Sequence, residues 1–549
     1  MLRVRRLGRV PYDEAFALQR ALAERSGDDY LLLLEHPSVY TMGVRADPEH
    51  VLATPTSVGA ELARTDRGGD VTYHGPGQLV IYPLVGIDHG PGAGPAHVHR
   101  LEQVLLDALA DLDVGPAQGG LGRHPSHPGV WLGTDDGRLR KVAAVGVRTR
   151  RVGGRRRTLH GAAVNVDCDL SMFGHIVPCG LELPVTSLAA EGLPISMDQL
   201  AEAVIARSLE AWSGVHDRQD VTTGPIGEVD TTGERHPIRR LRQAGVDPGA
   251  SLPLDARKPS WLRVPARMGS EFARLGRTVH ELGLVTVCEE AGCPNIFECW
   301  ADGTATFMVN GARCTRACGF CLVDTSRPLP LDPEEPTRVA EAVARMDLAH
   351  AVVTCVARDD LPDGGAGALA ATVRAIRERR SGTTVELLIS DCKGDGPSLS
   401  NIFDARPDVL NHNIETVARL QRAVRPSAGY ARSLSVLARA ADAGLTVKSG
   451  LMVGLGEHED EVVSTLADLH GVGVSIATIG QYLRPSAAHL PVARWWEPAE
   501  LERLGQAGRE LGLAHVEASP LTRSSYHARS AAVAAGAVPV TLSGSKAAV

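Results

Sequence analysis

The chain has 549 residues, of which 44% are hydrophobic and 22% charged, and its 57 Lys and Arg against 65 Asp and Glu give a formal net charge of −8. These proportions are typical of a globular protein, and the length predicts roughly two or three hydrophobic cores. Because the acidity is slight, the charge gives no reason to expect nucleic acid or an anionic membrane as a partner.

The first residues, MLRVRRLGRV, are basic but have no apolar stretch behind them, which argues against a secretory signal. No apolar run reaches the roughly 18 residues of a membrane-spanning helix, so we expect a cytoplasmic location. Residues 1–215 alternate apolar runs such as YLLLLEH, LVIYPLVGI and GAAVNVD with helical stretches such as HVHRLEQVLLDALADL. This alternation predicts a first domain built from both strands and helices.

Residues 216–258 are rich in Gly, Pro, Thr and charge and have no sustained apolar period, which predicts a flexible linker with at most one short helix. A second periodic region covers 259–530. There, runs such as AVVTCVA, TVELLIS and TVKSGLMVG alternate with helical stretches, which predicts parallel βα units in an open sheet or a partial or full barrel. The small-residue tail, 531–549, is expected to fray.

Two motifs of the first region could carry chemistry. Cys179 lies in Pro178-Cys179-Gly180, where proline and glycine would fix a loop with an exposed thiol, although a lone cysteine is more often buried filler. The glycine-rich block 67–78 precedes the strand LVIYPLV. Its glycines could let an acyl chain pass close to the backbone, and otherwise it is a surface loop. Cys168 has no such context and is expected to be structural.

Together with LLLLEHPSVYTMG, PGVW, RKVAAVGV and HGAAVNV, these blocks resemble the lipoyl (octanoyl) transferases over about residues 5–215. The resemblance implies the fold of biotin and lipoate ligases, a mixed sheet flanked by helices. It also implies that Cys179 carries octanoate as a thioester and that Lys141 lowers the pKa of this thiol. The implied substrate-binding residues are Arg67, Gly68, Gly69, Asp70, Val71, Thr72, Tyr73, His74, Ala144, Val145, Gly146, Gly161, Ala162 and Ala163.

The same resemblance implies octanoyl-acyl carrier protein as donor. The implied acceptors are the lipoyl domains of 2-oxoacid dehydrogenase E2 subunits and the glycine cleavage H protein. The nearest alternative is an ATP-dependent ligase, which needs no cysteine nucleophile.

Six of the ten cysteines lie between residues 288 and 321, a crowding that indicates metal binding or catalysis rather than disulfides. Cys314, Cys318 and Cys321 follow the apolar run TATFMVNG with the spacing C-x3-C-x2-C. Three such thiolates can hold three irons of a [4Fe–4S] cluster and leave the fourth iron open to S-adenosyl-L-methionine. A structural zinc site would need a fourth protein ligand.

A second trio, Cys288, Cys293 and Cys299, has the spacing C-x4-C-x5-C, which is not that of a zinc ribbon. These thiolates imply a second cluster, whose fourth ligand must come from elsewhere in the chain. Cys355 and Cys392 are expected to be small buried hydrophobic residues.

The blocks KPSWLRVPARMG, TVCEEAGCPN, CTRACGFC, RDDLPDGGA, NHNIETV, KSGLMVGLGE, IGQYLRPSAAHLPV and PLTRSSYHA resemble lipoyl synthase, in order, across nearly all of 259–530. Phe297 stands where that family has glycine. The resemblance implies a radical S-adenosylmethionine βα barrel with two [4Fe–4S] clusters. The cluster on Cys314, Cys318 and Cys321 would generate the radical. The auxiliary cluster on the other trio would donate sulfur, with Ser524 or Ser525 as its fourth ligand.

The resemblance further implies that Gly454, Gly456 and Glu457 approach S-adenosyl-L-methionine, that ferredoxin or flavodoxin supplies electrons, and that sulfur enters at carbons six and eight of the octanoyl arm. The whole chain is therefore predicted to be a two-domain α/β enzyme of lipoyl-cofactor assembly. The alternatives for the second region are a methylthiolating radical enzyme and a ferredoxin-like electron carrier.

Overall fold

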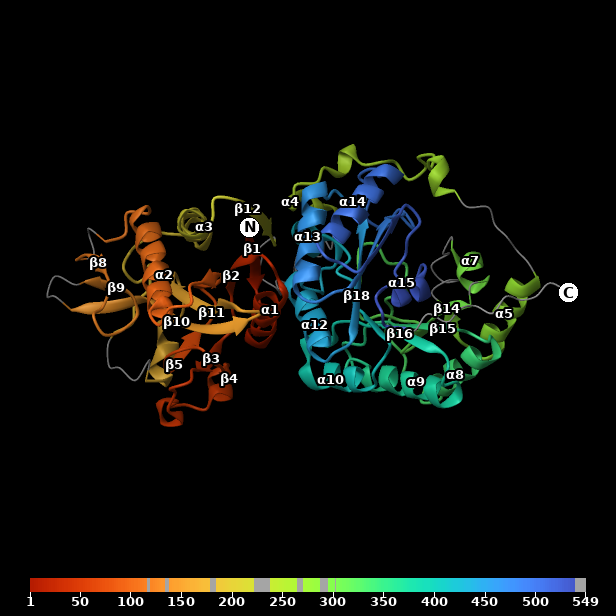
Figure 1. The fold of residues 1–549 in the computed structure, drawn as a ribbon, viewed down its shortest axis with the longest axis horizontal. Helices are drawn as coiled ribbons and strands as arrows, with labels where there is room; N and C mark the ends of the chain where they lie inside the picture. The colour runs from red at the N-terminus through yellow and green to blue at the C-terminus, as the bar shows by residue number, and fades with distance from the viewer. Residues whose placement is uncertain are drawn as a thin grey trace. The chain divides into compact units, whose positions relative to one another are not determined.

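The computed structural model describes residues 1–115, 119–133, 138–177, 184–221, 237–263, 270–286, 295–301 and 303–538, without the side chains of 270–275 and 301. The chain divides into two compact units, Met1–Thr231 and Thr232–Val549, and each is described by itself (Figure 1). No helix in the described ranges is long and apolar enough to span a membrane.

The N-terminal unit contains a large mixed sheet with the order β12-β1-β2-β6-β11-β10-β9-β8, in which β7 also pairs with β11. β1 is parallel to β12 and β2, and the other neighbours along the order are antiparallel. The strands are β1 (Leu2–Arg9), β2 (Asp29–Glu35), β6 (Gln78–Leu84), β7 (Gly86–Ile87), β8 (Leu121–Gly122), β9 (Gly129–Gly133), β10 (Leu139–Val152), β11 (Arg155–Asn165) and β12 (His216–Asp220).

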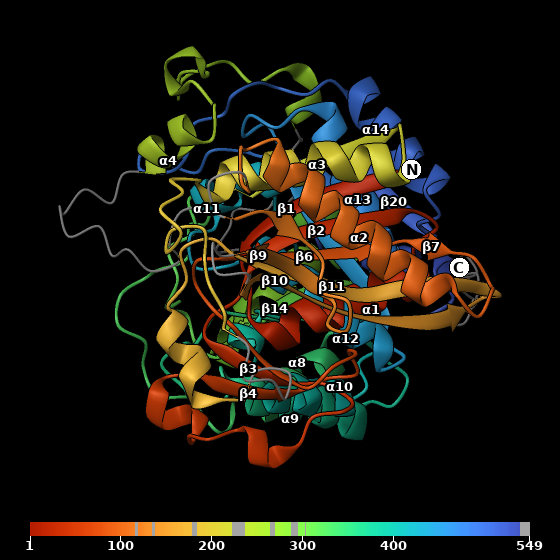
Figure 2. The same cartoon turned by 90° about the vertical axis from the view of Figure 1, so that its left-hand side faces the viewer.

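A small second sheet in this unit has the order β4-β3-β5, formed by β3 (Val39–Met42), β4 (Glu61–Arg64) and β5 (Val71–His74). Helices α2 (Ala93–Ala110) and α3 (Met197–Trp212) pack their apolar faces on the large sheet and complete its main core (Figure 2). Helix α1 (Tyr12–Arg25) contacts β6 and β11. The expected mixed sheet with flanking helices is confirmed.

The C-terminal unit is a βα barrel. Seven consecutive strands, β14 to β20, pair in parallel in chain order, and the short β13 adds to β14 in the antiparallel direction. Among the described residues no pairing joins the two ends, so the barrel is partial. The strands are β13 (Val285–Thr286), β14 (Thr304–Val309), β15 (His350–Cys355), β16 (Thr384–Leu388), β17 (Val409–Asn411), β18 (Thr446–Val453), β19 (Ile476–Gln481) and β20 (His515–Ser519).

Amphipathic helices connect these strands and cover the outside of the barrel (Figure 1). The helices of this unit are α4 (Pro237–Gln243), α5 (Ser270–Glu281), α7 (Ile296–Ala301), α8 (Glu335–Arg345), α9 (Ala366–Arg379), α10 (Gly396–Asp404), α11 (Gln421–Val424), α12 (Tyr430–Asp442), α13 (Glu459–Gly471), α14 (Pro498–Glu510) and α15 (Ala528–Ala534). Because the strands are parallel, their carboxyl ends lie at one end of the barrel, where the cysteine motif follows β14.

The expectation of a flexible linker over 216–258 is wrong at both ends. Residues 216–220 form β12, which extends the N-terminal sheet beside β1. Residues after 237 pack on the barrel unit, where Leu241 and Val246 are buried and Leu252 N donates to Val492 O at 2.8 Å. Isolated apolar residues that dock onto an existing domain leave no periodic pattern in the sequence. Residues 222–236 lie outside the described residues.

The expectation of a frayed tail is also wrong as far as residue 538. Ala531, Ala532 and Val538 are buried in one cluster with Val409 and Ile476, the first residues of β17 and β19. Small side chains allow this close approach to the strands, and a composition rule cannot distinguish it from fraying. Residues 539–549 lie outside the described residues.

Candidate active sites

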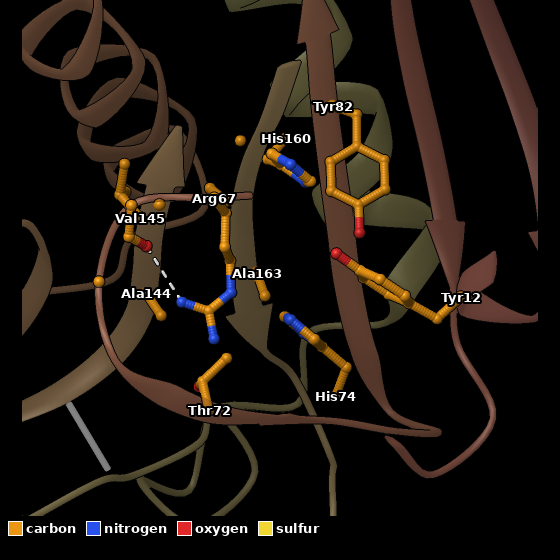
Figure 3. A pocket seen from close by; sticks show the side chains of 14 residues that line it. Tyr12, Arg67, Thr72, His74, Tyr82, Ala144, Val145, His160 and Ala163 are labelled. Carbon is orange, nitrogen blue, oxygen red and sulfur yellow. Dashed lines mark hydrogen bonds between the residues drawn. The ribbon is translucent and has the colours of Figure 1, made fainter. Parts of the chain in front are cut away.

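The N-terminal unit contains a cavity of about 480 Å³, open mouth included, at the junction of β5, β10 and β11 (Figure 3). Eleven of the fourteen expected substrate-binding residues line it, and sequence reasoning missed Tyr12, Tyr82 and His160. The expected residues that line the cavity are Arg67, Gly68, Gly69, Thr72, His74, Ala144, Val145, Gly146, Gly161, Ala162 and Ala163.

The other three expected residues lie outside the cavity because side chains alternate along β5. Val71 and Tyr73 point to the opposite face, into a separate hydrophobic cluster. Asp70, just before the strand, has its carboxylate 2.6 Å from His50 Nδ1 and accepts from Val71 N. The structure therefore gives these three residues supporting positions around the cavity.

Two glycines keep the cavity open where strands and loops approach closely. A Cβ on Gly161 would lie 2.0 Å from Ile81 O, and one on Gly146 would lie 3.0 Å from Gly68 O. No larger residue fits at Gly161 without moving β6. Ala144 adds a small apolar side chain to the lining, whereas the side chain of its neighbour Val145 packs against the main core.

The polar side of the cavity is built from histidine, tyrosine and one arginine (Figure 3). Arg67 is buried, with its Nε 3.1 Å from Thr41 Oγ1 and its Nη1 3.0 Å from Gly68 O. Burial lowers the pKa of His74 well below its usual range, and the nearby His36 and Arg67 lower it further. Burial also lowers the pKa of His160, although Asp66 at 2.8 Å opposes this. At neutral pH the cavity therefore presents neutral imidazoles and one fixed guanidinium.

Cys179 lies outside the described residues, within 178–183, but the chain on both sides of it is fixed. Val177 N donates to His50 O at 2.8 Å. On the far side, Lys141 N donates to Pro184 O at 2.9 Å and Thr186 N donates to Lys141 O at 3.0 Å. Lys141 Nζ lies 4.8 Å from the centre of the Trp131 ring. The described residues on the two sides of this segment thus lie beside His50 and beside Lys141. Elsewhere in this unit, Cys168 is buried as expected.

In the C-terminal unit, the loop Cys314–Cys321 follows β14 at the carboxyl end of the barrel and is tied to its neighbours by backbone hydrogen bonds. Cys314 N donates to Asp324 O at 2.8 Å, and Gly319 N donates to Val424 O at 2.9 Å. A Cβ on Gly319 would lie 2.7 Å from Leu490. Burial raises the pKa of Cys318 to about 12, while Arg425 lowers it. Such a thiol ionises only when a cation compensates its charge.

Arg316, inside the cysteine loop, was not singled out from the sequence. Its side chain is buried and lies 2.7 Å from Asp359 and 2.6 Å from Asp391, which follow β15 and β16. Burial by itself raises the pKa of Asp391, but the Arg316 guanidinium has the larger effect, and the pKa is lowered to about 2. This ion-pair network attaches the cysteine loop to the next two strand ends. The signal that could have revealed it is the acidic pair in RDDLPDGG.

Gly454, Gly456 and Glu457 form a tight turn after β18. Both glycines have positive φ angles, 106° and 111°. The buried Glu457 carboxylate accepts from Leu455 N at 2.9 Å and from Trp496 Nε1 at 2.9 Å. A Cβ on Gly456 would lie 2.5 Å from Val246. These contacts give Glu457 a role in holding the turn, and cofactor contact by the three residues stays a prediction.

The segment that contains Ser524 and Ser525 lies beside α7, which contains Cys299. Asn295 Nδ2 donates to Leu521 O at 2.7 Å, and Tyr526 Oη donates to Glu298 at 3.2 Å. The structure thus brings one expected cluster ligand next to the two expected serines, more than 220 residues away in sequence. Cys288 and Cys293 lie outside the described residues. Cys392 is buried as expected, whereas Cys355 is only partly buried.

Comparison with known proteins separates the same two units. The lipoyl protein ligase A/B catalytic domain matches residues 11–208, and the radical SAM superfamily matches residues 309–469. A lipoyl synthase of Rubrobacter xylanophilus is 56% identical over 273 residues, 49% of this chain and 85% of the relative. One of Mycobacterium avium is 55% identical over 279 residues, 51% of this chain and 91% of the relative.

The chain belongs to the lipoyl synthase family. It also carries an N-terminal lipoyl protein ligase A/B catalytic domain, so it is an enzyme of lipoate biosynthesis with two catalytic domains. Among solved structures, a bipartite lipoate protein ligase from Thermoplasma acidophilum is 18% identical, with a TM-score of 0.33, over 41% of this chain and 88% of that chain.

Membership of the lipoyl synthases implies iron–sulfur clusters and S-adenosyl-L-methionine. The donor set fits, because three thiols lie in one short loop and are close enough to interact: Cys321 and Cys314 raise the pKa of Cys318, and Cys314 raises the pKa of Cys321. Within the described ranges no three His, Cys, Asp or Glu side chains converge on a single metal ion. The ligands of an iron–sulfur cluster need not converge on one ion, because each thiolate binds a different iron.

In this lipoyl synthase unit a fully buried ion pair joins β16 to β18 across β17. Lys448 Nζ lies 2.9 Å from Glu386, whose other oxygen accepts from Asn411 Nδ2 at 2.8 Å. Burial by itself raises the pKa of Glu386, but Lys448 and His350 together have the larger effect. The pKa is therefore lowered, and the carboxylate is ionised. The pair fixes the relative position of two strands that end at the site.

We predict that Lys448→Met lowers the free energy of unfolding of the barrel unit by about 3–5 kcal/mol, because it removes the lysine that pairs with the buried Glu386 carboxylate. Denaturant titration followed by hydrogen exchange on β16 and β18 measures this change. The double variant Lys448→Met/Glu386→Gln should recover most of the loss. Equal stability of the wild-type chain and the single variant would contradict the prediction.

Proposed function

We propose that the chain performs two consecutive reactions of lipoyl-cofactor assembly, as octanoyl-[acyl carrier protein]:protein N-octanoyltransferase and as lipoyl synthase. The N-terminal unit transfers octanoate from acyl carrier protein to a lysine of a lipoyl domain. The C-terminal unit then inserts sulfur at carbons six and eight of that octanoyl arm. The observation that supports the first half is that Pro184 and Thr186, just after the Cys179 segment, pair with Lys141 on β10, the strand whose Ala144 and Gly146 line the cavity.

In the transfer reaction, the Cys179 thiolate attacks the thioester of the donor, and the carrier thiolate leaves. Exchange of one thioester for another is nearly isoenergetic. The Lys141 ammonium favours the thiolate form of Cys179. Ala144 and the glycines at 146 and 161 enclose the alkyl chain. The neutral amine of the acceptor lysine then attacks the acyl group, the cysteine leaves with its electron pair, and the amine loses a proton.

In the sulfur-insertion half, Cys314, Cys318 and Cys321 would hold the radical-generating cluster, which supplies one-electron cleavage of S-adenosyl-L-methionine. Ferredoxin or flavodoxin would deliver the electron. Gly454, Gly456 and Glu457 shape the turn after β18 for the cofactor. Acid–base groups alone cannot ionise the unactivated C–H bonds of an alkyl chain, which is why radical chemistry is required.

The auxiliary cluster would be held by Cys288, Cys293, Cys299 and a serine of the segment beside α7. Ser525 is the better of the two candidates, because Ser524 Oγ already lies 2.7 Å from Asn413 Nδ2. The proposal places the octanoyltransferase in residues 1–221 and the synthase in residues 237–538. These limits are wider than the 1–215 and 259–530 expected from the sequence.

The test uses the reconstituted full chain with apo lipoyl domain and follows the mass of that domain. With octanoyl-acyl carrier protein and no ATP, the domain should gain an octanoyl group. Addition of S-adenosyl-L-methionine and a reductant should then convert it to the lipoyl mass. A chain that octanoylates only with free octanoate and ATP would be a ligase. Octanoylation without later sulfur gain would leave only the transferase half of the proposal standing.

A further inference from the structure

The hairpin that joins β10 to β11 is strongly basic in a chain of net negative charge. Residues 148–157 include six arginines and no acidic residue. Figure 2 shows these strands running side by side, and they are the longest of the N-terminal sheet. The arginines are Arg148, Arg150, Arg151, Arg155, Arg156 and Arg157.

Among the described residues, two of these arginines lie within 3.1 Å of a carboxylate, and Arg148 interacts with Asp66 only at longer range. Arg150 lies 2.8 Å from Glu24, and Arg157 lies 3.1 Å from Asp29. Arg156 donates to neutral oxygens, those of Thr149 and Gly90. Among the side chains that the structure describes, the exposed residues Arg148, Arg151 and Arg155 have no hydrogen-bond or ion-pair partner. The hairpin therefore presents uncompensated positive charge to solvent.

This arrangement costs stability rather than adding it. Across the antiparallel ladder Arg150 lies directly opposite Arg157, and Arg151 directly opposite Arg156. Like charges at directly opposed positions destabilise a strand pair. Arg150, Arg156 and Arg157 have partners in the fold, but folding of the hairpin gives no reason for the exposed Arg148, Arg151 and Arg155, so their charge points to a ligand that is absent from the isolated chain.

The hairpin is continuous with the walls of the cavity. Gly146 on β10 lies opposite Gly161 on β11, and both line it. Arg148 comes two residues after Gly146, and Arg151 five residues after it. At about 3.4 Å per residue the arginines begin about 7 Å from the wall and reach about 17 Å from it. A partner bound to the hairpin would thus stand at a distance from the cavity while its arm reached inside.

We propose that this arginine hairpin docks the octanoyl donor, an acidic carrier protein whose acyl chain is borne on a phosphopantetheine arm. The inference rests on the proposed transferase function and adds the surface where its donor binds. Guanidinium groups bind carboxylates and phosphates in bidentate fashion, and both occur on such a carrier. The donor fits better than the acceptor because its arm is long. A lipoyl domain offers only a lysine side chain and must come up to the thioester itself.

The test compares the wild-type full chain with Arg148→Glu/Arg151→Glu/Arg155→Glu. Acylation of Cys179 is measured with octanoyl-acyl carrier protein and with octanoyl-N-acetylcysteamine, a small uncharged thioester. We expect kcat/KM with the carrier to fall by about tenfold or more through a rise in KM, as when electrostatic steering is lost. The rate with the small thioester should stay unchanged. The difference between the two chains should shrink as salt is added.

The control variant, Arg100→Glu/Arg242→Glu/Arg374→Glu, makes the same charge change at exposed positions of α2, α4 and α9. It should keep the wild-type KM for the carrier. Equal loss in both variants, or no loss in the hairpin variant, would overturn the proposal. A third result would also overturn it: the hairpin variant is acylated by the carrier at the normal rate, but its acyl group passes more slowly to the lipoyl domain. The hairpin would then bind the acceptor rather than the donor. If wild-type chain is acylated by neither thioester, the transferase function itself fails.

Discussion

Replacing Cys314, Cys318 and Cys321 together by alanine will abolish the formation of 5′-deoxyadenosine from S-adenosyl-L-methionine. These thiols lie in one loop, which backbone hydrogen bonds hold at the carboxyl end of β14, and burial raises the pKa of Cys318. Without them no iron is held for the cofactor. We expect cleavage to fall to the uncatalysed background, measured by chromatography of the nucleoside after reduction.

The matched variant replaces Cys288, Cys293 and Cys299 by alanine. It should still cleave S-adenosyl-L-methionine but add no sulfur to the octanoyl arm, whereas the unrepaired wild-type chain should stop after about one lipoyl group. Iron and sulfide analysis must first show that each variant keeps its other cluster, because loss of thiolate ligands can unfold a metal-dependent region. Repeated sulfur insertion by the matched variant would mean that the sulfur comes from another source.

The second large effect is expected at Cys179. Cys179→Ala should reduce octanoyl transfer by at least about 10⁴-fold, as loss of a covalent nucleophile does in other enzymes. Lys141→Ala should retain a slower reaction, reduced about 10²-fold at neutral pH, because the thiol loses the ammonium that favours its ionised form. The rate of Lys141→Ala should recover as pH rises, and Lys141→Arg should stay close to wild type in its pH profile.

Mass spectrometry of wild-type chain incubated with octanoyl-acyl carrier protein should locate the acyl group on Cys179. The buried Cys168 serves as an internal control, since burial raises its pKa to about 12 and its thiol should stay unmodified. An acyl group on any other residue would refute the assignment, and an unchanged pH profile in Lys141→Ala would remove Lys141 from the mechanism.

The periodic apolar pattern predicted strands and helices in the first region and parallel βα units in the second, while the mixed sheet of the first region was implied by the resemblance to a known family. The same resemblance predicted most of the cavity, through the glycines at 146 and 161 and the block around Arg67. Val71 and Tyr73 lie away from the cavity because alternate residues of a strand point to opposite faces, which a contiguous sequence block does not reveal.

Other features depended on tertiary contacts that no local pattern encodes. Tyr12 and Tyr82 reach the cavity from α1 and β6, far from the motif that marks it. Arg316 gains its role only when Asp359 and Asp391 arrive from the next two strand ends. The contacts of Leu521 and Tyr526, on either side of Ser525, with the α7 region join residues more than 220 apart in the sequence, and only a resemblance could suggest them beforehand.

The parallel pairing of β12 with β1 decides where the chain can be cut into its two units. A break after residue 215 would remove β12 and leave β1 as an unprotected edge strand, which invites pairing with other copies of the chain. It would also remove Asp217, which accepts hydrogen bonds from the buried guanidinium groups of Arg3 and Arg5. Buried charge that loses its partner is strongly destabilising. A break between residues 222 and 236 keeps every described contact of both units, so isolated halves made there would start from intact sheets.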